Sequence, residues 1–566
     1  MRPQLAQTLR TQRLALLAGA VALGYGLLFL RSFELQVVRG DALRERQLRQ
    51  IAREEVLPGQ RGDVLDRNGV LLGTSAWRYQ VLAETASLAA PERARIAAEL
   101  ASITGESSAR LAQRMAGEAP LVRLVYGLHE PEVAQLRAKQ LPHLRIERIR
   151  LRAYPTHEGP LPPLAPAYTG FVGVEGKGLS GVELAFDPVL TGRSHTQAVR
   201  RDGRRRRMLD AYSSVDDRTG QAVHLTLDAR LQLEAERALA RALERTGGQA
   251  ASLVAIDPRN GDVLVSAEAP SFDSNAFWNE DPARFRARAW TDEFEPGSTL
   301  KPFVAALALD AGVIGLDEEI DCGEGRLQIG RNAIRDLEPH GALRLADALR
   351  VSSNIAAARL GERLGARALV EGLRRFGFGQ SRGEVFPGAA DGSVRNVTDR
   401  YPLDRATLAF GQGMRTSVVQ LALAGAALAS GGVRVEPRIA LRVGERTLPS
   451  GRTDDRVVSE ATARQVLEML EGVVRDGTGR AAALEHYAVA GKTGTAQKFL
   501  DGAYSHKRFV VSFLGIVPVD DPRLVVVVAI DEPKRDASGG QGAAPVFREF
   551  AWAALRTLEV PAEGAP

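Results

Sequence analysis

Hydrophobic positions separate one continuous apolar segment near the start of the chain from a long remainder of short, periodic segments. Leu14–Leu30 is uncharged and mostly apolar, and Arg13 and Arg31 bracket it. As a helix this run would span about 25 Å, slightly less than the hydrocarbon core of a bilayer, and both arginines can reach the polar interfaces. The pattern predicts one transmembrane helix over residues 14–36, and no second run approaches its length.

The charges before the apolar run favour a cytoplasmic N-terminus, because Arg2, Arg10 and Arg13 place positive charge there. A cleaved signal peptide is the alternative. The A-x-A triplet Ala18–Ala20 lies inside the apolar run and leaves almost no hydrophobic region before it. We therefore expect an uncleaved signal anchor, with residues 1–13 in the cytoplasm and the chain after the anchor outside.

The segment after the anchor changes its pattern several times. Ala42–Glu55 is polar and helix-forming, which predicts a helical stalk that continues the anchor. Asn68-Gly69 stands between short apolar stretches in residues 61–71 and predicts a hairpin. Residues 90–150 are rich in Ala, Leu, Glu and Arg at helical spacing, and Pro155–Pro166 holds five prolines, which predicts a loop or linker.

From Val223 onward the pattern is that of an α+β domain. Leu225–Glu244 reads as the end of a strand followed by a long helix. Residues 252–256 and 263–266 are short apolar strands joined across Asn260-Gly261, which predicts a hairpin. Residues 509–517 and 524–530 form a second predicted strand pair, and residues 546–558 a closing helix. Strands at both ends with helices between them predict one domain whose sheet joins both ends of this region.

Composition removes several classes of function. The chain has 566 residues, 45% hydrophobic and 25% charged, and a net charge of +5. This small excess of positive charge and an aromatic content of 5% argue against nucleic-acid binding. The single cysteine, Cys322, excludes an intrachain disulfide and a cysteine-based metal cluster, and we expect it to be a core thiol. The eight histidines form no HExxH pair, so no metal or other cofactor is expected.

Two further sequence patterns are weak evidence for a binding site. Gly176–Gly181 matches GxGxxG, but Asp187-Pro188 interrupts the long helix that a dinucleotide site requires. The basic tract Arg200–Arg207 predicts a solvated hairpin around Asp202-Gly203, with contact to anionic lipid or cell wall as the alternative.

Ser298 and Lys301 carry the central chemical pattern. Pro296-Gly297 turns the chain and the following run reads as a helix, so residues three apart share one face. A serine hydroxyl becomes a nucleophile when a neighbouring base takes its proton, and a desolvated lysine can be that base. The S-x-x-K pattern alone is common and carries little weight.

Two more clusters follow in order. Ser352-Ser353-Asn354 opens a predicted helix over residues 355–364, with a hydroxyl that can relay a proton; the alternative is that Ser352 is only an N-cap. Lys492-Thr493-Gly494-Thr495 reads as a strand that can hold a carboxylate and pair with an extended peptide. A phosphate-binding loop is the alternative there, but it requires a glycine where His486 stands.

Together, S-x-x-K, S-x-N and K-T-G in this order are the signature of penicillin-binding proteins and serine β-lactamases. Beyond these motifs, four stretches of the chain resemble class B penicillin-binding proteins: residues 61–69, 176–186, 294–302 and 409–413. The resemblance runs from the anchor to about residue 555 and is nearest to the division-specific septal transpeptidase. Serine in the middle of the second motif fits class B.

The resemblance implies a fold and a set of roles. Residues 37–221 would form an elongated pedestal, and residues 222–566 an α+β transpeptidase domain with a central antiparallel sheet flanked by helices. Ser298 would be the acylated nucleophile and Lys301 its proton acceptor. The other site residues would be Ser352 and Asn354 of the second motif and Lys492, Thr493 and Gly494 of the third, with the N–H groups of Ser298 and Thr495 as the oxyanion hole.

The implied reaction is cross-linking of cell-wall stem peptides, with β-lactams as mimics of D-Ala-D-Ala. The implied setting is the bacterial inner membrane, with an FtsW-like glycosyltransferase as partner. Four alternatives remain open: a serine β-lactamase, a bifunctional synthase, an elongation-specific class B enzyme, and a non-catalytic β-lactam sensor or division scaffold. The long region before Ser298 argues against the first, and the absence of a recognised glycosyltransferase motif argues against the second.

Overall fold

The computed structural model describes residues 3–43, 52–57, 59–117, 119–156, 162–193, 195–200, 219–500 and 502–562. The chain forms two compact units, Met1–Gln60 with Gly192–Thr219, and Arg61–Thr191 with Gly220–Pro566.

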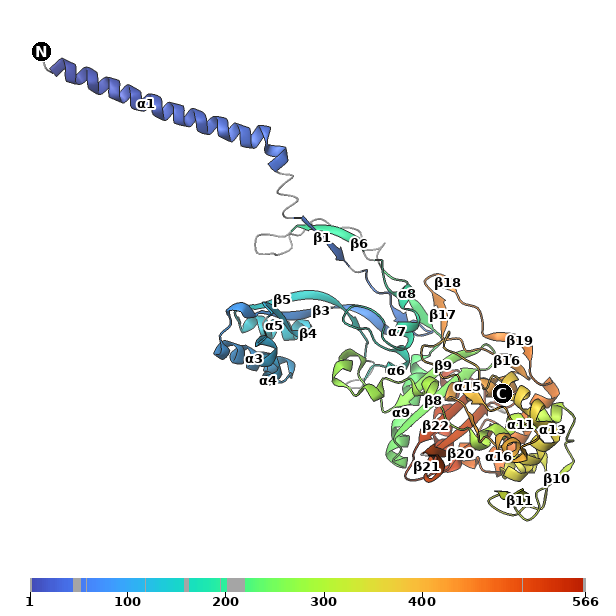
Figure 1. Ribbon diagram of the computed structural model, residues 1–566. Helices are drawn as coiled ribbons and strands as arrows, with labels where there is room; N and C mark the ends of the chain where they lie inside the picture. The colour runs from blue at the N-terminus through green and yellow to red at the C-terminus, as the bar shows by residue number, and fades with distance from the viewer. Residues whose placement is uncertain are drawn as a thin grey trace. The chain divides into compact units, whose positions relative to one another are not determined.

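The first unit contains the predicted anchor. Helix α1 (Pro3–Phe33) continues into one π-helical turn, Glu34–Val38, and Figure 1 shows α1 as one unbroken helix. Gln12–Val38 has a mean hydropathy of 1.9 and lies exposed; within the described ranges it is the one helix long and apolar enough to cross a membrane. The apolar run thus forms the helix that the hydrophobic pattern predicts.

The helical stalk predicted for Ala42–Glu55 is wrong in its last residues. Ala52–Leu57 is strand β1, which pairs antiparallel with β6 (His195–Arg200), from Ala52 opposite Arg200 to Leu57 opposite His195. Pairing with a strand far along the chain outweighs the local helix propensity of this segment. Arg200 ends β6, and residues 201–207 of the basic tract lie outside the described residues.

The second unit begins with the predicted hairpin. Strand β2 (Val64–Leu65) pairs antiparallel with β3 (Leu71–Glu84), with Leu65 opposite Leu71. The helices within the predicted pedestal are α3 (Ala90–Thr104), α4 (Ser108–Met115) and α5 (Glu130–Ala138). Two strands were missed in the region predicted to be helical, β4 (Leu121–Leu128) and β5 (Leu144–Ala153), which pair with β3 on either side. Their β-branched and aromatic residues favour strands once β3 offers an edge.

A buried ion network explains two of the stretches that carry the resemblance. Arg61 donates through Nε to Glu183 Oε2 at 2.6 Å and through Nη1 to Asp187 Oδ1 at 2.7 Å. Arg152 donates through Nε to Glu183 Oε1 at 2.5 Å. Gly178 donates its backbone N–H to Asp187 at 2.8 Å. The GxGxxG segment therefore supports this network and opens only the short helix α7 (Gly181–Ala185), which is no dinucleotide site.

A five-stranded antiparallel sheet forms the centre of the C-terminal region, in the order β20-β21-β22-β8-β9. Its strands are β8 (Ala250–Asp257), β9 (Asp262–Ala269), β20 (Ala490–Leu500), β21 (Ala503–Val517) and β22 (Leu524–Asp531). The two predicted strand pairs are therefore confirmed, and they lie in one sheet. Strand β20, which carries the K-T-G motif, is at the edge of this sheet.

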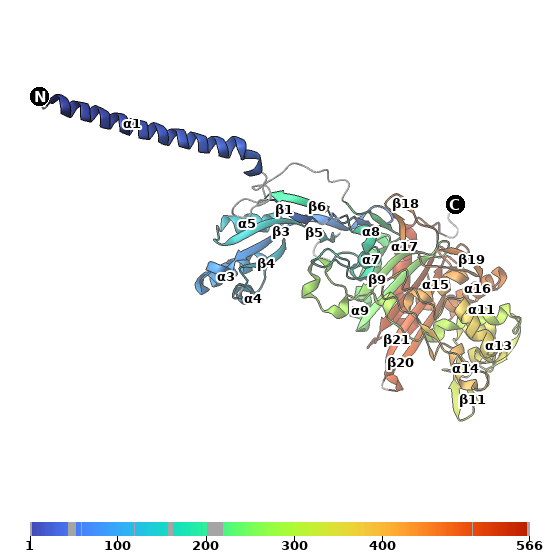
Figure 2. The ribbon, with the colours of Figure 1, turned by 45° about the horizontal axis from the view of Figure 1, so that its top comes forward.

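Helices cover both faces of the sheet, as Figures 1 and 2 show. Helices α9 (Ala229–Thr246) and α17 (Ala544–Thr557) pack on one face, and α15 (Val418–Ala429) packs on the other. Alternation along β8 separates the two cores, because Leu253 and Ala255 face the first layer while Val254 and Ile256 face the second. This α+β arrangement, an antiparallel sheet flanked by helices, is the predicted one.

The helices at the S-x-x-K and S-x-N motifs and the smaller elements complete the second unit. Helices α11 (Lys301–Asp310) and α13 (Asn354–Arg375) follow the first two motifs. The remaining elements are α6 (Pro166–Thr169), α8 (Asp187–Leu190), β7 (Val223–Leu225), α10 (Arg288–Thr291), β10 (Glu319–Asp321), β11 (Arg326–Ile329), β12 (Asn332–Arg335), β13 (Ala342–Arg344), α12 (Leu345–Arg350), β14 (Ser393–Val394), α14 (Pro402–Ala409), β15 (Met414–Arg415), β16 (Val433–Val435), β17 (Ala440–Val443), β18 (Arg446–Thr447), β19 (Arg452–Arg456) and α16 (Glu460–Asp476).

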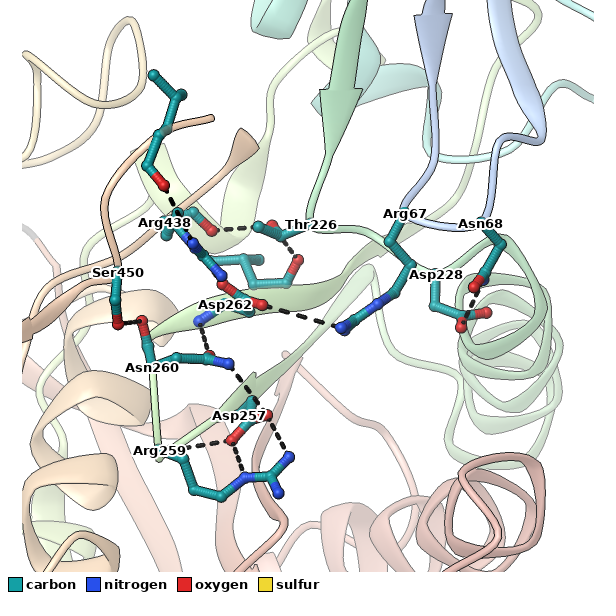
Figure 3. Close-up of polar contacts among 12 residues, drawn as sticks. Arg67, Asn68, Thr226, Asp228, Asp257, Arg259, Asn260, Asp262, Arg438 and Ser450 are labelled. Carbon is teal, nitrogen blue, oxygen red and sulfur yellow. Dashed lines mark hydrogen bonds and ion pairs between the residues drawn. The ribbon is translucent and has the colours of Figure 1, made fainter. Parts of the chain in front are cut away.

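Polar and charged side chains connect the β2–β3 hairpin with the C-terminal region (Figure 3). The Arg67 guanidinium lies 4.0 Å from Asp262 Oδ2, and Asn68 donates to Asp228 Oδ2 at 2.9 Å. Asp228 also caps the N-terminus of α9. These contacts connect the pedestal part of the second unit with the helix and strand that follow it.

Candidate active site

The Ser298 turn is shaped by two glycines. Gly297 has φ +54°, a left-handed conformation that favours glycine, and it donates its N–H to the Gly411 carbonyl at 3.0 Å. A Cβ on Gly411 would lie 2.1 Å from the Gly297 carbonyl oxygen, so a side chain there would push the two segments apart. The AFGQG stretch at residues 409–413 thereby fixes the turn that presents Ser298.

Ser298 and Lys301 lie on the same side of this turn. Gly297–Leu300 is a 3₁₀ helix, η6, and Lys301 begins α11. In a 3₁₀ helix residues i and i+3 eclipse, so the hydroxyl and the amine share a face, as the spacing predicts. Ser298 is partly exposed, whereas Lys301 is 2% exposed. The nucleophile candidate is accessible and the base candidate is buried.

The Lys301 amine is held by the second motif. Nζ donates to the Ser352 carbonyl at 2.5 Å and to Asn354 Oδ1 at 2.8 Å, and it lies 3.3 Å from Ser352 Oγ. Burial first, and then the charge of Lys492, hold the Lys301 pKa well below its usual value. The lowered pKa makes the neutral amine, whose lone pair can accept a proton, easier to reach. The carbonyl and the amide fix the position of the nitrogen.

Ser352 is strained and Ser353 is the cap. Ser352 has φ +62°, unusual for a residue with a side chain, and this conformation delivers its carbonyl to Lys301. The N-cap of α13 is Ser353, whose hydroxyl accepts from the Ala356 N–H at 3.0 Å. The interpretation of Ser352 as merely an N-cap is therefore wrong.

Asp336 holds the second motif in place, and the sequence motifs did not indicate it. Its carboxylate accepts from the Ser353 hydroxyl at 2.5 Å and from the Asn354 and Ile355 N–H groups at 2.6 and 3.1 Å. A carboxylate at the start of a helix is favoured by the helix dipole. Asp336 follows β12 in a separate loop, and no pattern around it indicates this role.

Lys492 completes the network from strand β20. Its Nζ donates to Ser352 Oγ at 2.9 Å and to the Thr493 carbonyl at 3.3 Å. Burial lowers the pKa of Lys492 to about 7. Ser352 Oγ thus lies between the two lysines and can pass a proton between the Lys301 side and a ligand. The Thr493 hydroxyl is oriented by donating to Thr478 Oγ1 at 2.9 Å, a second residue that sequence patterns did not indicate.

Close packing against the Ser298 turn requires glycine at position 494. A Cβ there would lie 2.4 Å from Ser512 Oγ, 2.8 Å from Thr299 Cγ2 and 3.0 Å from the Pro296 carbonyl. The glycine therefore allows β20 to approach the Ser298 turn directly. The Thr495 side chain is exposed, and its Oγ1 accepts from the Gly539 N–H at 3.2 Å. All eight candidate residues lie where η6, α13 and β20 meet.

Cys322 lies apart from this chemistry. The thiol is buried, 3.6 Å from the Ser353 hydroxyl, and burial raises its pKa. It packs behind the second motif as a core residue.

Comparison with known proteins gives one consistent group. The penicillin binding protein transpeptidase domain matches residues 251–551, and the penicillin-binding protein dimerisation domain matches residues 56–161. The probable peptidoglycan D,D-transpeptidase PenA of Neisseria gonorrhoeae is 31% identical over 558 residues, covering 97% of this chain and 93% of the relative. The peptidoglycan D,D-transpeptidase FtsI of Escherichia coli K12 is 30% identical over 564 residues, covering 97% and 92%. The crystal structure of penicillin binding protein 3 from Mycobacterium tuberculosis, complexed with aztreonam, is 28% identical, covers 90% of this chain and 98% of that chain, and superposes with a TM-score of 0.69.

Proposed function

The chain belongs to the class B penicillin-binding proteins, and we propose that it is a peptidoglycan D,D-transpeptidase that cross-links stem peptides through an acyl-enzyme on Ser298. One observation carries the proposal. The Lys301 amine is buried, has a pKa well below the usual value, donates hydrogen bonds to the second motif, and stands one 3₁₀ turn from an accessible serine.

The proposed acylation is a proton-coupled displacement. Ser298 Oγ attacks the carbonyl carbon between the two terminal D-alanines while Lys301 Nζ takes the hydroxyl proton. The peptide C–N bond breaks, and Ser352 Oγ delivers a proton to the leaving amine of D-alanine. The products are free D-alanine and an ester on Ser298. An amine from a neighbouring stem peptide then attacks the ester, and its proton returns to Ser298 by the same groups.

In this proposal the third motif binds the donor peptide. Lys492 and Thr493 hold the terminal carboxylate of the donor peptide, which a β-lactam carboxylate would mimic. The free edge of β20 pairs with the peptide backbone as an added strand. The N–H groups of Ser298 and Thr495 form the oxyanion hole, a device whose donors typically contribute about 3 kcal/mol to lowering the barrier.

The cellular setting follows from the anchor and the relatives. We propose a single-pass protein of the bacterial inner membrane with residues 1–13 in the cytoplasm, the anchor at 14–36, the pedestal at 37–221 and the catalytic domain at 222–566 outside. The relatives named FtsI support septal cross-linking, and an FtsW-like glycosyltransferase is the proposed membrane partner. An elongation-specific transpeptidase is the second candidate, because the same site performs the same chemistry there.

A labelling experiment tests the nucleophile. The full-length protein in detergent is incubated with a fluorescent penicillin and run on a denaturing gel beside Ser298→Ala. We expect covalent label on the wild type and none on the variant. Ser107→Ala, which removes a hydroxyl that caps α4 in the pedestal, is the matched control and should label like the wild type. A folded wild type that takes no label would refute the catalytic proposal in favour of the scaffold alternative.

A further inference from the structure

The carboxylate of Glu295 connects the Ser298 turn with two other segments of the site. Glu295 precedes the nucleophile by three residues. Its Oε1 accepts one hydrogen bond from the Gly413 N–H at 2.9 Å and another from the Tyr504 hydroxyl at 3.0 Å. Gly413 lies between α14 and β15, and Tyr504 is on β21, in the hairpin that β20 and β21 form. One oxygen atom therefore joins three segments that are far apart in sequence.

Backbone hydrogen bonds fix the segment beside Glu295 on one side. Phe294 and Thr416 exchange two backbone hydrogen bonds of 2.9 Å, and Gly297 donates to Gly411, so the turn is tied to residues 411–416 without any side chain. Toward the β20–β21 hairpin, the side-chain hydrogen bond is that of Tyr504, whose ring lies edge-on against Phe499 with centroids 5.2 Å apart. The Glu295 carboxylate thus adds a side-chain hydrogen bond between the hairpin and the turn, beside the direct packing of Gly494 in β20 against Thr299 and Pro296.

The surroundings of Glu295 do not favour a carboxylate for stability alone. Its second oxygen, Oε2, is buried and has no hydrogen-bond partner among the residues described. Burial raises the Glu295 pKa, and burial together with Glu295 raises the Tyr504 pKa to about 12. A buried oxygen that accepts no hydrogen bond is a net cost to folding. Stability therefore does not explain why a glutamate occupies position 295.

We propose that Glu295 is a positioning residue for acyl transfer, which holds the Ser298 turn and the β20–β21 hairpin at a fixed separation without touching the substrate. This inference rests on the proposed transpeptidase function, because it assigns a role in the same reaction. The substrate has to fit between Ser298 and the edge of β20, so a shift of either one misplaces the scissile carbonyl. Misplacement of about 1 Å can slow a reaction about 100-fold.

Three variants separate the parts of the proposal. Glu295→Ala removes both hydrogen bonds, Tyr504→Phe removes one, and Glu295→Gln keeps an oxygen that can accept both. We expect the limiting rate constant for acylation by a penicillin to fall at least about tenfold in Glu295→Ala and a fewfold in Tyr504→Phe. Glu295→Gln should stay within about threefold of the wild type. The apparent dissociation constant of the initial penicillin complex should change little, because Glu295 makes no contact with the ligand.

The double variant Glu295→Ala/Tyr504→Phe tests most directly whether Tyr504 and Glu295 act together. If Tyr504 acts through Glu295, its substitution adds nothing once the carboxylate is gone, so the double variant should equal Glu295→Ala. Tyr487→Phe is the matched control: its hydroxyl is also bonded, to the Val560 carbonyl at 2.8 Å, but away from the site, and it should acylate like the wild type.

Several results would overturn the inference. These are a Glu295→Ala rate equal to the wild type, a Glu295→Gln rate as low as that of Glu295→Ala, or additive losses in the double variant. Should Glu295→Ala fail to fold, Tyr504→Phe decides alone, and an unchanged acylation rate in it refutes the role of the hairpin. Failure of the proposed function is a separate result, because then the wild type itself takes no label.

Discussion

Two buried lysines face one serine hydroxyl, and their charges cannot be independent. Lys301 and Lys492 both lie within 3.3 Å of Ser352 Oγ. Burial depresses both pKa values, and the charge of Lys492 lowers that of Lys301 further. The charge of Lys492 thus favours the neutral form of Lys301, whereas the charge of Asp336 opposes it. The effect of Lys492 supports the proposed roles, Lys301 as the base and Lys492 as the cationic partner of a carboxylate.

The burial of Lys492 predicts a gain in stability when it is replaced. Its pKa is about 7 in the folded protein, against 10.5 for an ordinary lysine. Between these values the unfolded chain binds a proton that the folded protein lacks, so stability rises with pH across that window. Below pH 7 the folded protein bears the full cost of a buried charge. We expect Lys492→Met to raise the free energy of unfolding by about 2 kcal/mol at pH 6, and the gain to disappear toward pH 10.5.

Chemical denaturation at pH 6 and at pH 9.5 measures this difference. Lys498→Met is the matched control, because Lys498 is partly exposed and bonded to Asp531 and Glu532. Its replacement should lower stability by less than about 1 kcal/mol. A Lys492→Met protein less stable than the wild type at pH 6 would show that the ammonium is better solvated than its burial indicates.

At the scale of elements, the approach of β20 to η6 determines whether the site exists. Gly494→Ala would place a methyl group 2.4 Å from Ser512 Oγ and 2.8 Å from Thr299 Cγ2. The strand has to move away from the turn, so we expect acylation by a fluorescent penicillin to slow at least about tenfold and the free energy of unfolding to fall by 1–3 kcal/mol, as for other overpacked sites. Both are measured on the same preparation.

Gly472→Ala is the control for this substitution. Gly472 lies within α16, and a Cβ there meets nothing within 4 Å. The variant should acylate at the wild-type rate and gain about 0.5–1 kcal/mol of stability, because alanine favours a helix more than glycine does. Equal acylation rates for the two alanine variants would contradict the proposed steric limit at Gly494.

The elements that could be predicted from the sequence are those encoded locally. The hairpins around Asn68-Gly69 and Asn260-Gly261 were predictable because glycine and asparagine mark such turns, and both are observed. Strands β1, β4 and β5 were not, because their segments also suit a helix and only a distant partner strand decides the outcome.

The same distinction applies to the site. Ser298, Ser352 and Lys492 stand in short motifs, so their residue types and spacing were informative. Asp336, Thr478 and Glu295 act through contacts between segments far apart in sequence. A lone carboxylate or hydroxyl in a loop carries no local pattern that distinguishes it from a solvated side chain.

At the scale of the whole second unit, one core extends from the base of the pedestal into the catalytic region. Val64, Leu72 and Val182 belong to the same buried cluster as Leu300 in the Ser298 turn and Phe303 in α11. The distal pedestal helices enclose a separate cluster that includes Ile96, Leu111 and Val133. Damage at the pedestal base should therefore destabilise the catalytic region as well, although no pedestal residue contacts the site motifs in the described hydrogen bonds.

Glu183 is the position at which this coupling can be tested. It is 0% exposed and pairs with both Arg61 and Arg152, so Glu183→Gln leaves the buried Arg152 guanidinium without its counter-charge and leaves Arg61 with Asp187 alone. We expect a loss of about 3–5 kcal/mol in the free energy of unfolding, whereas Glu468→Gln, from an exposed pair with Arg464, should change it by less than about 0.5 kcal/mol.

Because the core is continuous, thermal loss of penicillin labelling should move to lower temperature together with unfolding of the pedestal base. At a temperature where the variant is fully folded, its acylation rate should equal that of the wild type. A labelling midpoint that stays unchanged would mean that the two regions unfold independently, and that the catalytic region does not depend on the buried ion network.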